Sequence, residues 1–231
     1  MSSPTIADKI INFNKSLKFK GKLPKNIHIM NPFEENPEAL EVSSIFYKKY
    51  YEDRKTRKLI LGINPGRFGA GVTGIPFTDT KRLQDKCGLE WHGHPTHETS
   101  SVFIYDMIEK YGGVHSFYKG YFINSVSPLG FVTKDEKGKE KNCNYYDSKA
   151  LLHGVGKFII ASISKIIALG VETEICYCLG TGKNYKYLVS LNQKEKIFNT
   201  IIPLEHPRYV MQYKLKKKEY YIDKYLKALC G

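Results

Sequence analysis

The chain has few cysteines, one tryptophan and no long uncharged hydrophobic run. Its five cysteines are odd in number and include no CxxC pair, which argues against a disulfide framework, a zinc ribbon or an iron–sulfur cluster. The first ten residues, MSSPTIADKI, lack the apolar core of a signal peptide. No stretch has the length and composition of a membrane span, so we expect a soluble cytoplasmic protein with no membrane partner.

Acidic residues are scarce relative to basic ones. The chain has 36 Lys+Arg against 23 Asp+Glu, a formal net charge of +13. This excess favours a polyanionic partner, with nucleic acid first, although a basic surface that only aids solubility would give the same balance. With 231 residues and 42% hydrophobic content, the chain is long enough for one α/β domain with a full core.

Hydrophobic patterning predicts strands that alternate with helices. Strands are expected at residues 58–63, 120–126, 174–179 and 200–204. Helices are expected at residues 4–18, 37–51, 78–87, 100–111, 151–169, 183–191 and 214–228. This order predicts one three-layer α/β domain over residues 1–231, with a mainly parallel four-stranded sheet between helices and a helical extension at about 1–55. The charged, glycine-punctuated segment 133–142 is expected to be a mobile surface loop.

The most informative stretch is residues 59–79, LILGINPGRFGAGVTGIPFTD. It combines a buried strand, a tight turn at Asn64-Pro65-Gly66 and a glycine-rich loop that ends at Phe77. Glycine permits a close approach of the backbone to a ligand, and open α/β sheets bind ligands at the carboxyl ends of their strands. The stretch therefore predicts a binding site.

Three predicted strands end in polar motifs, which begin at Asn64, Asn124 and His206. In a parallel sheet these ends share one edge, so we expect the three side chains and Phe77 to surround one crevice. Asn64 can hold a water, and the Asn124 amide matches the N3–H and O4 edge of uracil. Phe77 can stack on a flipped base, and His206 can donate a hydrogen bond to a departing base. Each residue also has a structural alternative, as a turn former, a buried amide or part of the core.

The motifs resemble those of the uracil-DNA glycosylase superfamily. GINPGRFGAGVTGIPF at 62–77 is similar to the first motif of its single-strand-selective monofunctional branch. FINSVSPLGF at 122–131 resembles the strand that supplies the uracil-reading asparagine, and His206-Pro207-Arg208 resembles the second motif. The matches follow the family's order over residues 59–210 and suggest a divergent, bacterial-type member.

The resemblance implies hydrolysis of the N-glycosidic bond of uracil, or of related deaminated or modified bases, in DNA. Asn64 would position the water and His206 would stabilise the uracil anion. Phe77 would stack on the base and Asn124 would read its edge. The rest of the base pocket would come from Gly62, Ile63, Pro65, Gly66, Phe68 and Gly69. DNA contacts would come from Arg67, Ser127, Arg208, Tyr209, Met211 and Lys214.

The family pattern departs after His206-Pro207, where RYVMQYKLKKK replaces a segment rich in proline and serine. Arg208, Tyr209 and Met211 are therefore candidates for the wedge that enters the duplex. The resemblance implies no cofactor, no metal and no lyase activity, with Lys81 and Lys183 as the lysines that would overturn the last expectation. The expected partners are single- or double-stranded DNA and free uracil as product, and the expected state is a monomer.

Two other functions fit parts of the sequence. The same fold could recognise nucleic acid without cutting it, because an asparagine activates water less well than an aspartate. A nucleotide-binding α/β enzyme could use a glycine loop for phosphate, but Gly180-Thr181-Gly182-Lys183 lacks the spacing of a P-loop. His92, His94 and His97 lie in a segment with no cysteine or carboxylate at a familiar zinc spacing, so a structural or DNA-facing loop is expected there.

Overall fold

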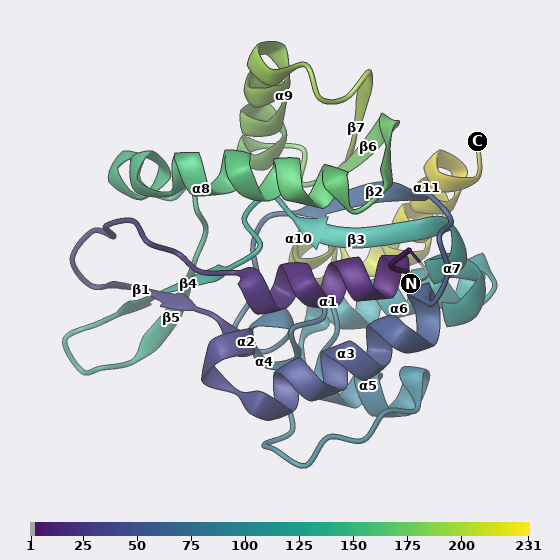
Figure 1. Cartoon of the computed structure of the whole chain (residues 1–231), viewed down its shortest axis with the longest axis horizontal. Helices are drawn as coiled ribbons and strands as arrows, with labels where there is room; N and C mark the ends of the chain where they lie inside the picture. Colours follow the sequence, from purple (N-terminus) through teal and green to yellow (C-terminus); the bar gives the residue numbers. More distant parts are fainter. Residues whose placement is uncertain (1–2) are drawn as a thin grey trace.

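A computed structural model describes residues 3–231 and contains a four-stranded parallel sheet (Figure 1). Strand β2 (Arg57–Gly62) pairs with β3 (Tyr121–Ser125) on one side and with β6 (Val171–Leu179) on the other. Strand β7 (Thr200–Leu204) pairs with β6 at the outer edge. The order is β3-β2-β6-β7, so the carboxyl ends of all four strands lie along one edge of the sheet.

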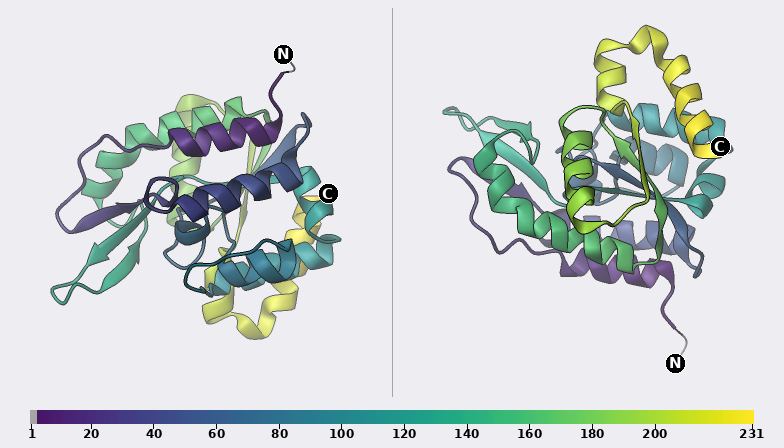
Figure 2. Two further views of the ribbon diagram at one scale, coloured as in Figure 1. Left: turned by 60° about the horizontal axis from the view of Figure 1, so that its bottom comes forward. Right: turned by 90° about the horizontal axis from the view of Figure 1, so that it is seen from above.

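Helices cover both faces of this sheet (Figures 1 and 2). On one face lie α8 (Lys149–Ala168) and α9 (Lys183–Glu195), with α1 (Ile6–Ser16) beside the end of α8. The other face carries α6 (Thr99–Tyr111), α7 (Val114–Gly120) and α11 (Lys218–Cys230). Tyr121 and Tyr177 fix α11 there, since their hydroxyls donate to backbone carbonyls of Leu229 and Ala228. The predicted three-layer α/β class is confirmed.

The remaining helices lie around these layers. Helix α3 (Pro37–Tyr51) has the predicted bounds, and α5 (Thr80–Cys87) begins after its N-cap Asp79. The sequence prediction omits α2 (Pro32–Glu35), α4 (Ala70–Thr73), α7 and α10 (Pro207–Tyr213). These four are short. Proline is the first residue of α2 and α10, and glycine is the N-cap of α4 and α7. The predicted helix 214–228 begins only at Lys218, because a 3₁₀ turn, η1 (Leu215–Lys217), precedes it.

The N-terminal helices contribute to the same hydrophobic core as the sheet. A capping box between Thr5 and Asp8 starts α1, with a hydrogen bond of 2.9 Å from the Thr5 backbone N–H to the Asp8 carboxylate. Ile10 and Phe13 of this helix are buried, as is Phe46 of α3. Helix α1 thus closes one side of the core.

A second sheet corrects the expectation of a mobile loop at 133–142. Strands β1 (Ile27–Met30), β4 (Gly130–Lys134) and β5 (Glu140–Cys143) form an antiparallel sheet in the order β1-β4-β5. The β4–β5 hairpin projects from the body of the molecule (Figure 2). Gly138, at φ 74°, forms its turn, and the buried Phe131 and Val132 anchor its base. The charges that suggested a loop belong to the exposed part of the hairpin, where β-pairing satisfies the backbone instead.

Helix α8 corrects the expectation that no segment could span a membrane by length and composition. Its 20 residues include a window of mean hydropathy 1.5. Leu151, Val155, Ile159, Ile163 and Ile166 are fully buried in the hydrophobic core. Packing against the sheet therefore explains why one face of this helix is apolar.

Arg57 is a fully buried side chain at the start of β2. Its guanidinium forms two ion-pair contacts with Asp53, at 2.8 and 2.9 Å, and donates to the Tyr118 carbonyl at 3.0 Å. It also donates to the Lys55 carbonyl and lies 5.4 Å from the centroid of the Tyr51 ring. Arg57 thus ties the end of α3 and the end of α7 to the central strand.

We predict that Arg57→Ala lowers the free energy of unfolding by about 3 kcal/mol, because buried carbonyls and Asp53 lose a charged donor. Urea unfolding followed by circular dichroism measures this loss. The matched control is Arg54→Ala, since Arg54 is exposed and donates, among residues 3–231, to the Ser3 carbonyl alone; we expect it to change stability by less than about 1 kcal/mol. Equal effects of the two substitutions would contradict the assigned role of Arg57.

Candidate active site

A cavity of about 190 Å³ opens at the carboxyl edge of the parallel sheet. Asn64, Phe77 and His206 line it together, as the position of the three motifs predicts. Its volume is below the roughly 300–1,000 Å³ of sites for drug-sized ligands, so it suits a small ring. The other lining residues are Ile63, Pro65, Gly66, Ala70, Pro76, Glu98, Ser100, Ser125, Asn142, Asn144, Arg208, Tyr209 and Gln212.

Asn64 joins the sheet edge to the segment that follows β5. Its Oδ1 accepts a hydrogen bond of 3.1 Å from the Tyr145 N–H, and its Nδ2 donates to the Cys143 carbonyl at 3.2 Å. A further donation from Nδ2 reaches the Pro65 carbonyl at 3.2 Å. These partners fix which end of the amide is oxygen, and that oxygen keeps a second lone pair for a ligand.

Phe77 adopts a backbone conformation that is rare for its residue type. Its φ is 53°, in the left-handed region, which costs on the order of 1–3 kcal/mol and is found mostly at functional sites. The ring lies against Gly62, where an added Cβ would stand 2.9 Å from Cε2 of the ring. Its centroid is 5.7 Å from that of His206, at an interplanar angle of 48°. Gly62 therefore acts by making room for the aromatic wall of the cavity.

His206 is held in one tautomer by the start of α10. It is the N-cap of this helix, and its Nδ1 accepts a hydrogen bond of 3.1 Å from the Arg208 N–H. The proton of a neutral ring must then be on Nε2. Burial, and secondarily the charge of Arg208, lower the pKa of His206 from 6.5 to about 4. The side chain is thus a neutral hydrogen-bond donor at physiological pH.

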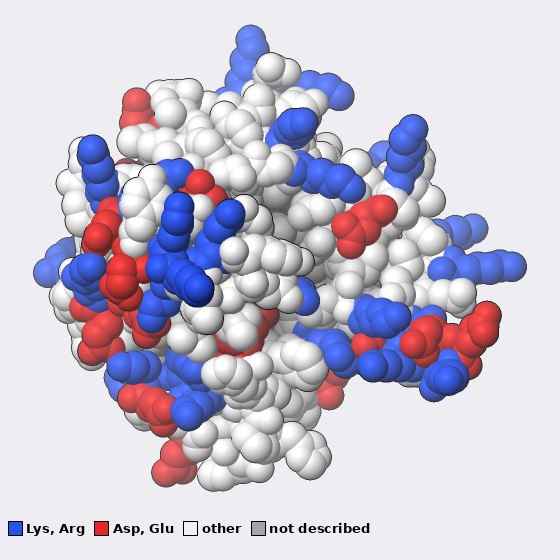
Figure 3. Space-filling model, turned by 180° about the vertical axis from the view of Figure 1, so that it is seen from behind, with Lys and Arg blue, Asp and Glu red and all other residues white. Residues whose placement is uncertain are grey.

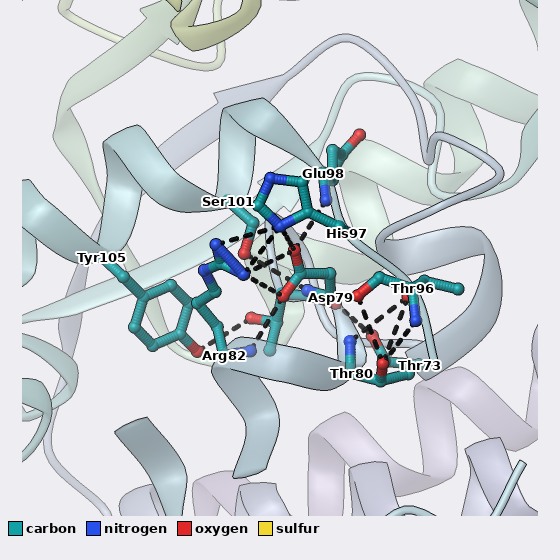
Figure 4. Close-up of polar contacts among 10 residues, drawn as sticks. Thr73, Asp79, Thr80, Arg82, Thr96, His97, Glu98, Ser101 and Tyr105 are labelled. Carbon is teal, nitrogen blue, oxygen red and sulfur yellow. Dashed lines mark hydrogen bonds and ion pairs between the residues drawn. The ribbon is translucent and has the colours of Figure 1, made fainter. Parts of the chain in front are cut away.

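Asp79 fixes the starts of helices α5 and α6, the second of which supplies the opposite wall (Figure 4). This buried carboxylate caps α5 by accepting from the Arg82 N–H at 2.8 Å, and it accepts from the Glu98 N–H at 2.6 Å. Its own N–H donates to the Ser101 hydroxyl at 3.3 Å. Glu98 and Ser100, at the start of α6, line the cavity as a result.

The sequence predicts Asn124 in the same crevice as Asn64 and His206; the structure places it in a small cavity that adjoins the main one. Ser125, the next residue of β3, lines both cavities, as do Pro65 and Pro76. Asn124 is 6% exposed and lines a small adjoining cavity of about 20 Å³ with Phe13 of α1. Its Oδ1 accepts a hydrogen bond of 2.7 Å from the Ser125 N–H.

The structure also corrects the predicted contact of Ser127 with DNA and the predicted place of Phe68 in the base pocket. Ser127 is fully buried and its hydroxyl donates to the Leu129 carbonyl at 2.9 Å, so it presents nothing to a DNA strand. Phe68 does not line the cavity; it is 45% exposed, and the Arg67 guanidinium lies 4.4 Å from its ring centroid. Both residues of this pair project from the glycine loop toward solvent.

The predicted DNA-contacting residues near the C-terminus have different surroundings. Arg208 and Tyr209 line the mouth of the cavity, and Tyr209 is 42% exposed beside Tyr213. Met211 instead packs against the hydrophobic core, which disfavours it as the wedge, and Lys214 is exposed. Lys and Arg side chains are spread over the face seen in Figure 3.

Several cavity residues lie outside the sequence prediction, namely Glu98, Ser100, Ser125, Asn142, Asn144 and Gln212. Asn142 and Asn144 come from the hairpin end that the sequence suggested was a loop, and Asn142 accepts from the Arg67 N–H at 3.1 Å. Strand alternation after Asn124 could have identified Ser125. The segment considered as a phosphate loop does not line the main cavity. Gly180, Gly182 and Lys183 line a second cavity that adjoins it.

The histidine-containing segment is a structural loop. His97 Nδ1 lies 3.1 Å from the Arg82 guanidinium, and the His92 N–H bonds to Glu38. Within residues 3–231, no group of three or more histidines, cysteines or carboxylates could hold a metal ion.

Comparisons with known proteins identify the family. Residues 48–230 match the family model described as the uracil DNA glycosylase superfamily. The crystal structure of wild-type Pedobacter heparinus SMUG2 is 54% identical to this chain, with a TM-score of 0.96 over 98% of this chain and 97% of that one. The comparison with curated proteins found no match.

The chain therefore belongs to the uracil DNA glycosylase superfamily. Its similarity to SMUG2 confirms the predicted kinship with the SMUG-type branch of that family.

We predict that His206 stays neutral between pH 5 and 8. Because its folded pKa is below its unfolded value, stability should fall as the pH drops from about 6.5 through about 4, where the unfolded chain binds the proton more readily. Nitrogen-15 NMR should report a protonated Nε2 and an unprotonated Nδ1 across pH 5–8, with His206→Asn identifying the signals. A titration near pH 6.5 would contradict this assignment.

Proposed function

We propose that this protein is a monofunctional glycosylase that hydrolyses the N-glycosidic bond of uracil in DNA and releases free uracil. The observation that carries the proposal is a neutral histidine donor, an aromatic ring and an amide in one cavity of single-base size. Membership of the uracil DNA glycosylase superfamily supports the reaction class.

Each of the three side chains has one role. Phe77 stacks on the extruded base, because its ring forms a wall of the cavity beside His206. The Nε2–H of His206 donates to O2 of uracil, where negative charge develops as the C–N bond breaks. Asn64 holds the attacking water with the free lone pair of Oδ1. A neutral donor is preferable here, since a cationic imidazole would be costly to bury.

The other polar lining residues supply recognition and the monofunctional outcome. We assign the edge of the base to Asn124 and Ser125, which line the adjoining cavity together, and to Asn142 and Asn144. Among the described residues, those lining the cavity include no lysine, so no amine is available to form a Schiff base with the sugar. Lys183 lies in the adjoining cavity near the Tyr146 ring, and Lys81 is exposed on α5. Arg208 and Tyr209 at the mouth would contact the DNA strand.

The test is cleavage of a labelled oligonucleotide with one deoxyuridine, single-stranded or opposite guanine, followed by alkali. We predict strand scission by the wild type after alkali but not before it. Asn64→Ala should reduce the single-turnover rate by about 100-fold or more, since the water loses its position. Asn64→Asp is the matched variant, because it keeps the acceptor for the Tyr145 N–H and for the water.

For the wild type and each variant, the DNA affinity and the melting temperature are measured together with the rate. Loss of rate with DNA affinity retained separates an enzyme from a binding module on the same fold. A wild type that leaves uracil in place in both substrates would refute the uracil assignment and favour the non-catalytic function or another base.

A further inference from the structure

Glu98 is the only carboxylate among the described residues that line the main cavity. It precedes the first residue of α6, and its side chain turns away from the helix instead of capping it. The Oε1 atom lies 2.8 Å from where a Cβ on Gly66 would stand, and Oε2 occupies the corresponding space at Gly69. These two glycines of the first motif therefore make room for a carboxylate that comes from a different part of the chain.

The reaction needs a proton acceptor that the residues discussed so far do not provide. Water that attacks a sugar carbon must lose a proton, and an amide such as Asn64 does not accept one. His206 is also unsuited, because its Nδ1 is occupied by the Arg208 N–H and its Nε2 carries the proton. Arg208 is a permanent cation. Glu98 shares the cavity with Asn64 and is the lining group with a free basic oxygen.

The surroundings of Glu98 suit this task. No hydrogen bond from residues 3–231 reaches its carboxylate, while its backbone is fixed by the bond to Asp79. Burial, and then the negative charge of Asp79, raise the pKa of Glu98 from 4.5 to about 7, and the charge of Arg208 opposes the rise. Beyond these groups, neutral His206 lines the same cavity, and Arg82 and His97 lie against the far side of Asp79. A base is most effective when its pKa is near the working pH.

We propose that Glu98 is the general base of the hydrolysis, an inference that rests on the proposed glycosylase function. The water oxygen forms a bond to C1′ of the sugar while the C1′–N bond breaks and its electron pair goes to the base. The water proton passes to the Glu98 carboxylate. Protonated Glu98 then releases that proton to the departing base or to solvent, which restores the ionised form. Asn64 orients the water and Glu98 takes its proton, so two residues share what one aspartate could do.

The test is the single-turnover rate of uracil excision at saturating protein, measured from pH 5 to 9. The wild type should gain rate through an acidic limb with a midpoint near pH 7. Glu98→Gln should lose about 100-fold at pH 8 and lose this limb. The matched control is Glu109→Gln, a change at an exposed position of the same helix that pairs with Lys86; it should follow the wild type.

A second variant tests the electrostatic environment of Glu98, and its result does not depend on whether Glu98→Gln folds. Arg208→Gln removes the charge that lowers the pKa of Glu98, so the midpoint of the limb should move to higher pH, whatever the loss in overall rate. An unmoved midpoint, or Glu98→Gln within about three-fold of the wild type with the limb intact, would overturn the proposal. A wild type without activity on uracil would instead refute the proposed function itself.

Discussion

The parallel pairing of β2 with β3 and β6 is the constraint on which the site depends. Gly62 at the end of β2 lies opposite Ser125 of β3, and Leu179 at the end of β6 lies opposite Leu204 of β7. Because β2 also pairs with β6, all four strands end at the same level. The turns that follow must therefore leave the sheet at the same edge, and segments far apart in the chain meet there. Asn64 and His206 are therefore brought to one cavity by the backbone hydrogen bonds of the sheet.

Polar groups at this edge are held by partners that lie behind the cavity. Asn64 is bonded to the backbone after β5, and Asp79 fixes the starts of α5 and α6 with one buried carboxylate. The strained backbone of Phe77 persists because its ring has a fitted position against Gly62. These contacts hold the side chains of the cavity in place, which lowers the cost of ordering catalytic groups.

The sequence predicts those features that depend on local pattern. Apolar runs identify all four parallel strands, and the polar motifs at Asn64 and His206 that follow two of them mark the site. It does not predict that the site consists of two adjoining cavities, of which Asn124 lines the smaller, because that division depends on tertiary packing. Glu98 is also missed, since its approach to Gly66 depends on tertiary packing. The hairpin at 130–143 is missed because its charges resemble those of a loop.

The most direct test of this account is a crystal structure of the protein with DNA that carries a deoxyuridine analogue resistant to hydrolysis. We predict that the uracil ring is extruded, stacks on Phe77 and accepts a hydrogen bond at O2 from His206 Nε2, at about 3 Å. A base that remains stacked in the DNA, or that occupies a different cavity while Asn64, Phe77 and His206 contact no part of it, would contradict the assignment of the site.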